Sequence, residues 1–261
     1  MWGTTASASA GVPPLLFPVV GTVTYTNDFG QARPGGTHQG NDLLATKRAP
    51  VVAVEGGTIE YWTTSAAAGC MLYLHGDSGT MYEYIHLNND LTAANDNKGT
   101  CVQGVAYSVP DGMHVEAGEQ IGYVGDSGDA NGIHPHLHFE LHPKEGKAVS
   151  PFPFLKKAAH LLLAAPPAGA PFTLRLTGTV VSADEQQLTI TVASLTAWPS
   201  HMKLSKLNRV VTLTLPAAAV GAAWSFFAGE KLIAWTMPSP GTVEALTGAP
   251  GGLSLDRALP L

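Results

Sequence analysis

Four of the ten histidines in the chain lie within nine residues, in the stretch HPHLHFELH that begins at His134. Side chains on a β-strand point alternately to its two faces, so these histidines and Glu140 are expected on one face. The apolar side chains between them are expected on the other face. The pattern therefore predicts a half-buried strand with one apolar face and one face of imidazoles and a carboxylate.

A second group of this kind lies upstream in GGTHQGNDLLA, where His38 and Asp42 are four residues apart. In an extended or gently turned segment this even spacing returns both side chains to one side, where they could contact the same cation. With a further histidine they would form a nitrogen and oxygen ligand set that suits zinc and leaves one tetrahedral position for water. The HxxxD spacing alone is weak evidence, because such pairs are common in surface loops.

The elements that must position these residues are short β-strands. From Phe17 to about Leu155 the sequence consists of short apolar alternations that end at glycines, and HGDSGT between two of them is a hairpin signal. This pattern predicts a meandering antiparallel sheet. The polar interval from Asn88 to Val109 predicts a long loop, a feature that is usually functional or disordered in a compact domain.

The composition changes in HLLLAAPPAGAPF, which has the Ala and Pro content of a semi-rigid spacer. We therefore divide the chain into an N-terminal arm (1–16), a β-sheet domain (17–157), a linker (158–171) and a small all-β domain (172–261). In the last domain, Thr or charged residues alternate with Leu, Ile and Val, which predicts a small closed or partly open barrel. The oligonucleotide/oligosaccharide-binding (OB) barrel is one candidate, and the role of this domain stays open.

The overall composition argues against two classes of partner. Charged residues make up 13% of the chain, the formal net charge is -6, and no run of Lys and Arg could attract nucleic acid or anionic lipid. The longest apolar segment, around residues 161–165, is far shorter than the roughly 18 residues of a membrane span. We therefore expect no nucleic-acid partner and no membrane span.

The two cysteines, Cys70 and Cys101, have no metal-ligand spacing and permit one disulfide. A disulfide in an exported protein and two buried thiols in a reducing compartment both stay open at this point. The opening residues lack a basic n-region and contain prolines in their apolar run, so we do not expect them to be a signal peptide.

Four motifs occur in a fixed order along the chain: HQGND, YIHL, VEAGEQIGYVGDSG and HPHLHFEL. In this order they resemble the lysostaphin-like zinc endopeptidases of bacterial cell walls, peptidase family M23, over about residues 17–155. The resemblance implies an antiparallel sheet with a groove across it and zinc at the groove floor. It further implies hydrolysis of peptide bonds in the stem peptide or cross-bridge of peptidoglycan, and an extracellular or cell-wall location.

Residue by residue, the resemblance makes His38, Asp42 and His138 the zinc ligands. His136 would be the general base that takes a proton from the zinc-bound water, and His86 would orient that water or stabilise the oxyanion. These roles are chemically sensible, because zinc can lower the pKa of bound water from about 16 toward about 7, close to the unperturbed pKa of imidazole.

Neighbouring positions carry further expectations. Glu140 is expected to accept a hydrogen bond that fixes a histidine tautomer. His134 is expected in the groove wall, His142 is expected to be exposed, and Tyr84 is expected to face the same way as His86. Asn41 and the long interval after YIHL depart from the family pattern; the latter would alter the groove rim and with it the substrate preference.

Two alternatives to a cell-wall endopeptidase stay open. The first is a catalytically silent relative that binds the cell wall or regulates another hydrolase. Such proteins generally lack one or more ligands, whereas all five motif residues are present here. The second is an intact zinc peptidase that acts on another protein or peptide, which nothing in the groove sequence excludes.

Overall fold

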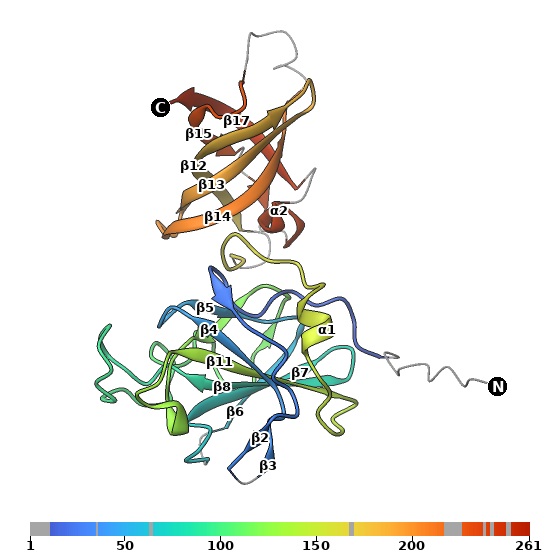
Figure 1. Cartoon of the computed structure of the whole chain (residues 1–261), viewed down its shortest axis with the longest axis vertical. Helices are drawn as coiled ribbons and strands as arrows, with labels where there is room; N and C mark the ends of the chain where they lie inside the picture. Colours follow the sequence, from blue (N-terminus) through green and yellow to red (C-terminus); the bar gives the residue numbers. More distant parts are fainter. Residues whose placement is uncertain are drawn as a thin grey trace, which may run out of the picture. The chain divides into compact units, whose positions relative to one another are not determined.

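The computed structural model describes residues 11–34, 36–62, 65–166, 170–216, 226–236, 239–240, 243–248 and 252–261. The chain divides into two compact units (Figure 1). The first comprises the residues up to Val19 and Val23–Ala158, and the second comprises Val20–Thr22 and Ala159–Leu261. Both units are built mainly from strands, which confirms the predicted fold class. Within the described residues, no helix has the length and apolar character needed to cross a membrane.

The first unit contains a seven-stranded sheet in the order β1-β4-β11-β8-β7-β6-β9. Every neighbouring pair in it is antiparallel, as the sequence predicts. In sheet order the strands are β1 (Val23–Thr24), β4 (Asn41–Ala45), β11 (His136–Pro143), β8 (Thr80–Leu87), β7 (Cys70–Gly76), β6 (Gly57–Trp62) and β9 (His114–Val115).

Smaller elements complete this unit. They are the antiparallel pair β2 (Ala32–Arg33) and β3 (Gly36–Thr37), the antiparallel pair β5 (Pro50–Val52) and β10 (Gln120–Tyr123), the 3-10 turn η1 (Gly128–Ala130) and the short helix α1 (Phe152–Leu155).

The core of the first unit lies against one face of the large sheet. Leu137, Phe139 and Leu141 of β11 are fully buried, so the apolar face predicted for the histidine strand is present. The fully buried Tyr82 ring of β8 stacks on Phe139 with ring centroids 5.9 Å apart. Each such side chain stabilises the fold by about 1.5–3 kcal/mol when it leaves water.

The segment between β8 and β9 is the long loop that the sequence predicts, and a disulfide and a buried ion pair are among the contacts that hold it in place. A disulfide joins Cys101 in the loop to Cys70 in β7, so of the two states that the sequence allows for these cysteines the structure has the bonded one. The Asp90 carboxylate, which is fully buried, lies 2.6 Å from Lys47 Nζ and also accepts bonds from backbone amides of the loop. The ion pair offsets the cost of burying both charges.

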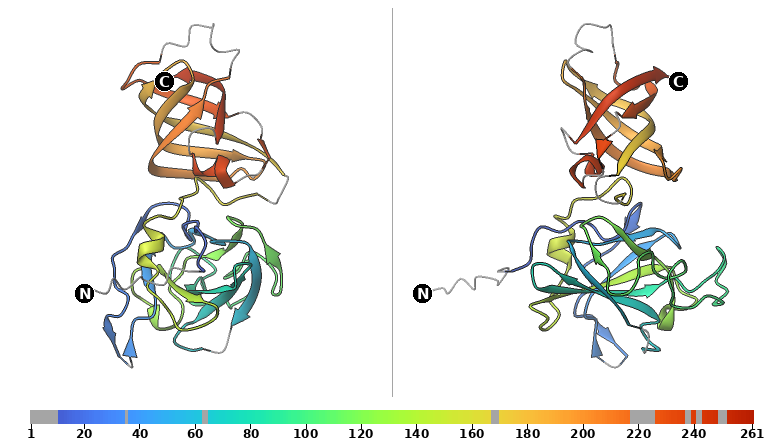
Figure 2. Two further views of the ribbon diagram at one scale, coloured as in Figure 1. Left: turned by 90° about the vertical axis from the view of Figure 1, so that its right-hand side faces the viewer. Right: turned by 180° about the vertical axis from the view of Figure 1, so that it is seen from behind.

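Among the described residues of the second unit, five long strands close into a barrel (Figure 2). The strands are β12 (Pro171–Ala183), β13 (Gln187–Trp198), β14 (Lys203–Thr214), β17 (Leu253–Pro260) and β15 (Lys231–Thr236). They pair in this order, and β15 returns to β12; only β14 and β17 are parallel. The short β16 (Ser239–Pro240) pairs antiparallel with the start of β12, and α2 (Val243–Thr247) precedes β17. Five strands agree with the small barrel expected, of which the OB type is one form.

The predicted arm and linker are only partly described. Residues 1–10 and 167–169 lie outside the described residues, while Leu15 of the arm is buried in the core of the first unit. In the predicted linker, the Leu162 amide donates to the Leu246 carbonyl at 2.7 Å, so this part is hydrogen-bonded to the second unit. The boundaries chosen from composition stay predictions.

We expect Leu137→Ala to lower the free energy of unfolding of the first unit by about 2–5 kcal/mol, because it leaves a cavity in a fully buried position. Leu91→Ala is the matched control, since Leu91 is exposed in the long loop and its loss should change stability by about 0.5 kcal/mol or less. Urea unfolding of both variants measures the difference. Equal effects would contradict the assignment of the buried face.

Candidate active site

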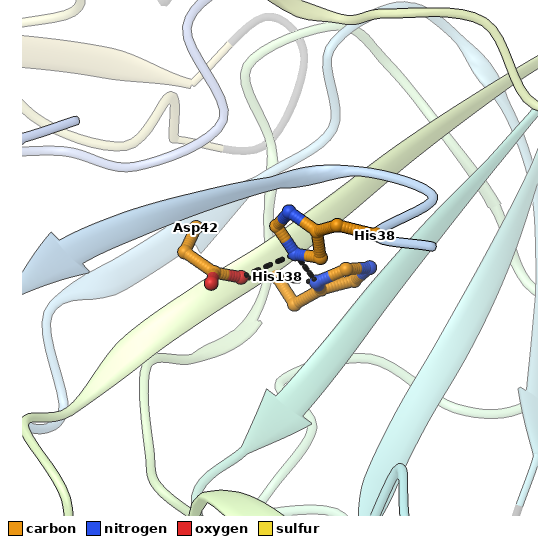
Figure 3. A group of neighbouring side chains, drawn as sticks. All are labelled: His38, Asp42 and His138. Atoms are coloured by element: carbon orange, nitrogen blue, oxygen red, sulfur yellow. Dashed lines mark hydrogen bonds and ion pairs between the residues drawn. The ribbon is translucent and has the colours of Figure 1, made fainter. Parts of the chain in front are cut away.

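The pairing of β4 with β11 brings the first two candidate ligands together. Asp42 and His138 are direct partners in this antiparallel register, so their side chains lie on the same face. His38 precedes β4 and reaches the same point through a turn at Gly40 (Figure 3). A Cβ atom at Gly40 would lie 2.4 Å from the Phe139 carbonyl oxygen, so only glycine allows this close approach to β11.

Three ligand atoms form a compact triangle (Figure 3). His38 Nε2 lies 3.0 Å from Asp42 Oδ1 and 2.9 Å from His138 Nδ1, and the last two atoms are 3.0 Å apart. Bonds of about 2.0–2.2 Å to a tetrahedral zinc ion would place ligand atoms roughly 3.3–3.6 Å apart, close to this spacing.

Hydrogen bonds on the far side of each imidazole decide which nitrogen faces the triangle. His38 Nδ1 lies 3.0 Å from the Asp28 carbonyl oxygen, which only accepts, so Nδ1 carries the hydrogen and Nε2 a lone pair. His138 Nε2 lies 2.9 Å from Glu140 Oε1, which leaves the Nδ1 lone pair for the triangle. The acceptor role expected for Glu140 is therefore present in the structure. Two lone pairs and a carboxylate that converge in this way fit a divalent metal ion.

Two carboxylates of the site are charged at neutral pH. Burial raises the pKa of Asp42, but hydrogen bonds with His138 and His38 lower it by more, well below its usual range. Burial likewise opposes ionisation of Glu140, yet hydrogen bonds with His138 and His142 lower its pKa to about 2. Asp42 can therefore serve as an anionic ligand, and Glu140 as an anionic acceptor.

Two residues that support the ligands escape sequence reasoning. The Arg33 guanidinium donates to Asp42 Oδ2 at 3.0 Å and leaves Oδ1 directed at the triangle. The second is Asp28, whose carbonyl fixes the tautomer of His38 and whose Oδ1 accepts a hydrogen bond from the Asn41 amide. Asn41, where the sequence departs from the family pattern, thus ties the Asp28 segment to β4.

His86 reaches the site because its backbone is left-handed. It lies near the end of β8 with φ 63°, an uncommon conformation for a residue other than glycine. The expectation that Tyr84 faces the same way is wrong: Tyr84 is fully buried in the core, and its hydroxyl accepts a hydrogen bond from the Val54 amide at 3.1 Å. The alternation of faces along β8 is broken between the two residues, and His86 lies at the cavity beside Ile85.

His86 and His136 form a second pair of imidazoles beside the triangle. Their ring centroids are 5.0 Å apart, and His136 Nε2 lies 3.8 Å from Asp42 Oδ1. The Nδ1 atoms face the backbone carbonyl oxygens of Ser127 (2.9 Å) and His134 (3.0 Å), so both Nε2 atoms can carry lone pairs. Burial and the neighbouring His136 lower the pKa of His86 to about 4, which makes this ring neutral at pH 7.

The remaining two histidines of the strand differ from expectation. His134, expected in the groove wall, is exposed, and the described residues that line the cavity do not include it. His142, expected to be exposed, has a side chain that is only 13% accessible. The turn after β11 folds back over His142 and covers it. His142 Nδ1 lies 2.9 Å from the Gly146 carbonyl oxygen in this turn, and His142 Nε2 lies 2.8 Å from Glu140 Oε2.

A cavity of about 600 Å³ opens over the triangle and the two further imidazoles. Ile85, Met71 and Trp62, from β8, β7 and β6, form part of its apolar wall. Trp62 is 40% exposed there. The cavity extends across several strands from the candidate ligands, a shape that suits an extended chain.

Ser127, which lies immediately before η1, positions His86. Its carbonyl accepts the His86 Nδ1 hydrogen, and its hydroxyl donates to the Leu87 carbonyl at 2.6 Å. The same hydroxyl accepts from the Cys70 amide at 2.9 Å. One buried residue therefore connects β7, the end of β8 and the imidazole of His86.

The geometry agrees with a comparison to known families. Residues 36–151 match the model of peptidase family M23. The resemblance inferred from the four ordered motifs is thereby confirmed.

Two curated relatives match the same part of the chain. The L-Ala--D-Glu endopeptidase of Bacillus subtilis is 27% identical over 150 residues, which cover 53% of this chain and 41% of the relative. An uncharacterized metalloprotease of Haemophilus influenzae is 32% identical over 124 residues, which cover 47% of this chain and 21% of the relative. The matched region thus spans less than half the length of either relative.

Among solved structures, the catalytic domain of lysostaphin from Staphylococcus simulans is similar to this chain. It is 27% identical with a TM-score of 0.41, and the match covers 51% of this chain and 92% of that domain.

We expect Ser127→Ala to lower the free energy of unfolding by about 1–3 kcal/mol, because it leaves the buried Cys70 amide without its acceptor. Ser78→Ala is the matched control: it removes hydrogen bonds at an exposed turn, where water replaces them, and should cost less than about 1 kcal/mol. Denaturant unfolding compares the two variants. A loss in Ser127→Ala no larger than that of the control would show that water satisfies the Cys70 amide.

Proposed function

We propose that the first unit is a zinc-dependent endopeptidase that hydrolyses peptide bonds in bacterial peptidoglycan, in the stem peptide or the cross-bridge. One observation carries the proposal. The compact triangle of His38, Asp42 and His138 lies beside two imidazoles, His86 and His136, whose Nδ1 atoms face backbone carbonyl oxygens and whose Nε2 atoms can therefore act as bases. A purely structural metal site has no need of two free bases at its edge.

The ligand roles follow from the hydrogen bonds. His38 Nε2, Asp42 Oδ1 and His138 Nδ1 would hold the metal ion, with Glu140 fixing the orientation of His138. A bound zinc ion supplies Lewis-acid polarisation of the substrate carbonyl and a lower pKa for the attacking water. The match to a peptidase family supports this assignment.

The two remaining imidazoles have different tasks. His136 Nε2 accepts the proton of the attacking water and later returns it to the leaving amine, as a general base and acid do in turn. His86 Nε2 also has a lone pair and belongs to a neutral ring, so it accepts a hydrogen bond from the water and orients it. This tautomer favours the orienting role over oxyanion stabilisation, because only a protonated Nε2 could donate to an oxyanion.

Two further observations support the location and the substrate class. The disulfide between Cys70 and Cys101 is typical of proteins outside the reducing cytosol, which supports an extracellular or cell-wall location. The Bacillus subtilis relative is named as an endopeptidase for an L-Ala–D-Glu bond, a peptide substrate of the proposed kind. A catalytically silent wall-binding or regulatory protein is the alternative, and the retention of all five site residues weighs against it.

The proposal is tested by the release of new amino groups from purified peptidoglycan. The zinc-loaded full chain should release them, and a chelator-treated sample should not until zinc is restored. Mass spectrometry of the fragments then names the bond. Stoichiometric zinc without release would favour the wall-binding alternative, and hydrolysis of a test protein but not of peptidoglycan would point to a peptidase with another substrate.

Two single substitutions on β11 separate metal binding from proton transfer. We expect His136→Ala to keep zinc at the triangle but to lose at least about a hundredfold in turnover, the typical contribution of a general base. His138→Ala should lose both zinc and turnover, because it removes a ligand atom. Metal analysis after dialysis, together with initial rates, distinguishes them. Equal zinc loss in the two variants would contradict this division of roles.

A further inference from the structure

A second cluster of metal-ligating side chains lies on the same sheet face, one row beyond the triangle. Glu83 of β8 and Glu140 of β11 are direct cross-strand partners, and His142 follows Glu140 by two residues on β11. His142 Nε2 lies 2.8 Å from Glu140 Oε2 and 3.4 Å from Glu83 Oε1. One ligand atom from each residue lies within 4.8 Å of the others.

The imidazole of His142 has the same arrangement as that of His38. Its Nδ1 lies 2.9 Å from the Gly146 carbonyl oxygen, which only accepts, so Nδ1 carries the hydrogen. The Nε2 atom then faces two carboxylate oxygens, so the three atoms converge as a possible set of metal ligands. Glu140 can serve both clusters, because its Oε1 contacts His138 while its Oε2 contacts His142.

The carboxylates of this cluster are held close together in partly dry surroundings. Like charges directly opposite each other across two strands destabilise a sheet. The side chains of Glu83, Glu140 and His142 are 17%, 12% and 13% accessible, so water screens the repulsion poorly. Among the described residues, the ion-pair partners of these two glutamates are His138 and His142, and no Lys or Arg pairs with them.

We propose that Glu83, Glu140 and His142 form a second site for a divalent transition-metal ion, beside the proposed catalytic one. One imidazole nitrogen and two carboxylate oxygens suit zinc or manganese. A dication there offsets the repulsion between the glutamates and accepts the lone pair of His142 Nε2. The affinity is lower than at the triangle, because Glu140 is shared with His138 and the contact to Glu83 is longer. Glu83 also lines the cavity, so the ion lies at the groove wall.

The test is a zinc titration of the metal-free full chain. Zinc binding is measured by calorimetry and by competition with a chromophoric chelator. The wild type should bind two equivalents, the second more weakly. Glu83→Gln, which keeps the shape but removes the charge, should weaken the second equivalent at least tenfold and leave the first unchanged. His142→Asn should do the same, since its amide can still donate to the Gly146 carbonyl while Nε2 is lost.

Two further variants serve as controls for the assignment. Glu60→Gln is the matched control. Glu60 lies on β6, which β7 separates from β8, and it pairs with His75 instead, so both zinc equivalents should bind as in the wild type. Asp42→Asn should weaken the first equivalent and keep the second. Thermal unfolding of each metal-free variant shows that it is folded before titration.

Three results would overturn the proposal. A single equivalent in the wild type would mean that His142 carries both ring hydrogens and pairs with the carboxylates as an imidazolium. An unchanged second equivalent in Glu83→Gln and His142→Asn would place that ion elsewhere. Loss of the second equivalent in His86→Ala, but not in those variants, would assign it to the imidazoles beside the triangle. Because stoichiometry is the readout, a failure of peptidoglycan hydrolysis leaves this test intact.

Discussion

The register between β4 and β11 is the constraint on which the site depends. It sets Asp42 opposite His138, and a slip of one residue would send one of the two side chains to the other face of the sheet. The burial of Leu137, Phe139 and Leu141 on the opposite face prevents that slip, because it would expose all three to water. The burial of the apolar side chains therefore also fixes the positions of the polar side chains on the opposite face of the sheet.

Hydrogen-bond acceptors around the outside of the site determine which nitrogen atoms of the histidines face its centre. The outer nitrogen of each imidazole donates a hydrogen bond to a fixed acceptor. These acceptors are the backbone carbonyl oxygens of Asp28, Ser127 and His134 and the Glu140 carboxylate. With hydrogens on these outer nitrogens, the inner nitrogen of each ring is the one that can direct a lone pair inward, toward the Asp42 carboxylate. Such an arrangement is unfavourable by itself, because lone pairs and negative charge repel, and it becomes favourable around a cation. Loops and strand ends, rather than the ligands alone, encode the affinity for a metal ion.

The parts that sequence could predict are those that depend on local periodicity or on ordered motifs. Alternation gives the two faces of β11 correctly, and the motif order identifies the family. Alternation predicts that His86 and Tyr84 lie on the same face of β8. This prediction fails because the left-handed backbone at His86 turns its side chain away from the face on which Tyr84 is buried. His142 is misjudged because its burial comes from a turn that folds back after the strand. The contacts of Arg33 and Ser127 depend on the tertiary structure, so no spacing in the sequence predicts them.

The loop that departs from the family pattern is connected to the chemistry through β7. Cys70 forms the disulfide that holds this loop, and its amide donates to the Ser127 hydroxyl. The Ser127 backbone carbonyl oxygen in turn accepts a hydrogen bond from His86 Nδ1. A displacement of the loop therefore acts on the imidazole that we assign to orienting the water, not only on the groove rim. The position of the loop and the position of the His86 imidazole are mechanically linked here, because both depend on the same buried strand end.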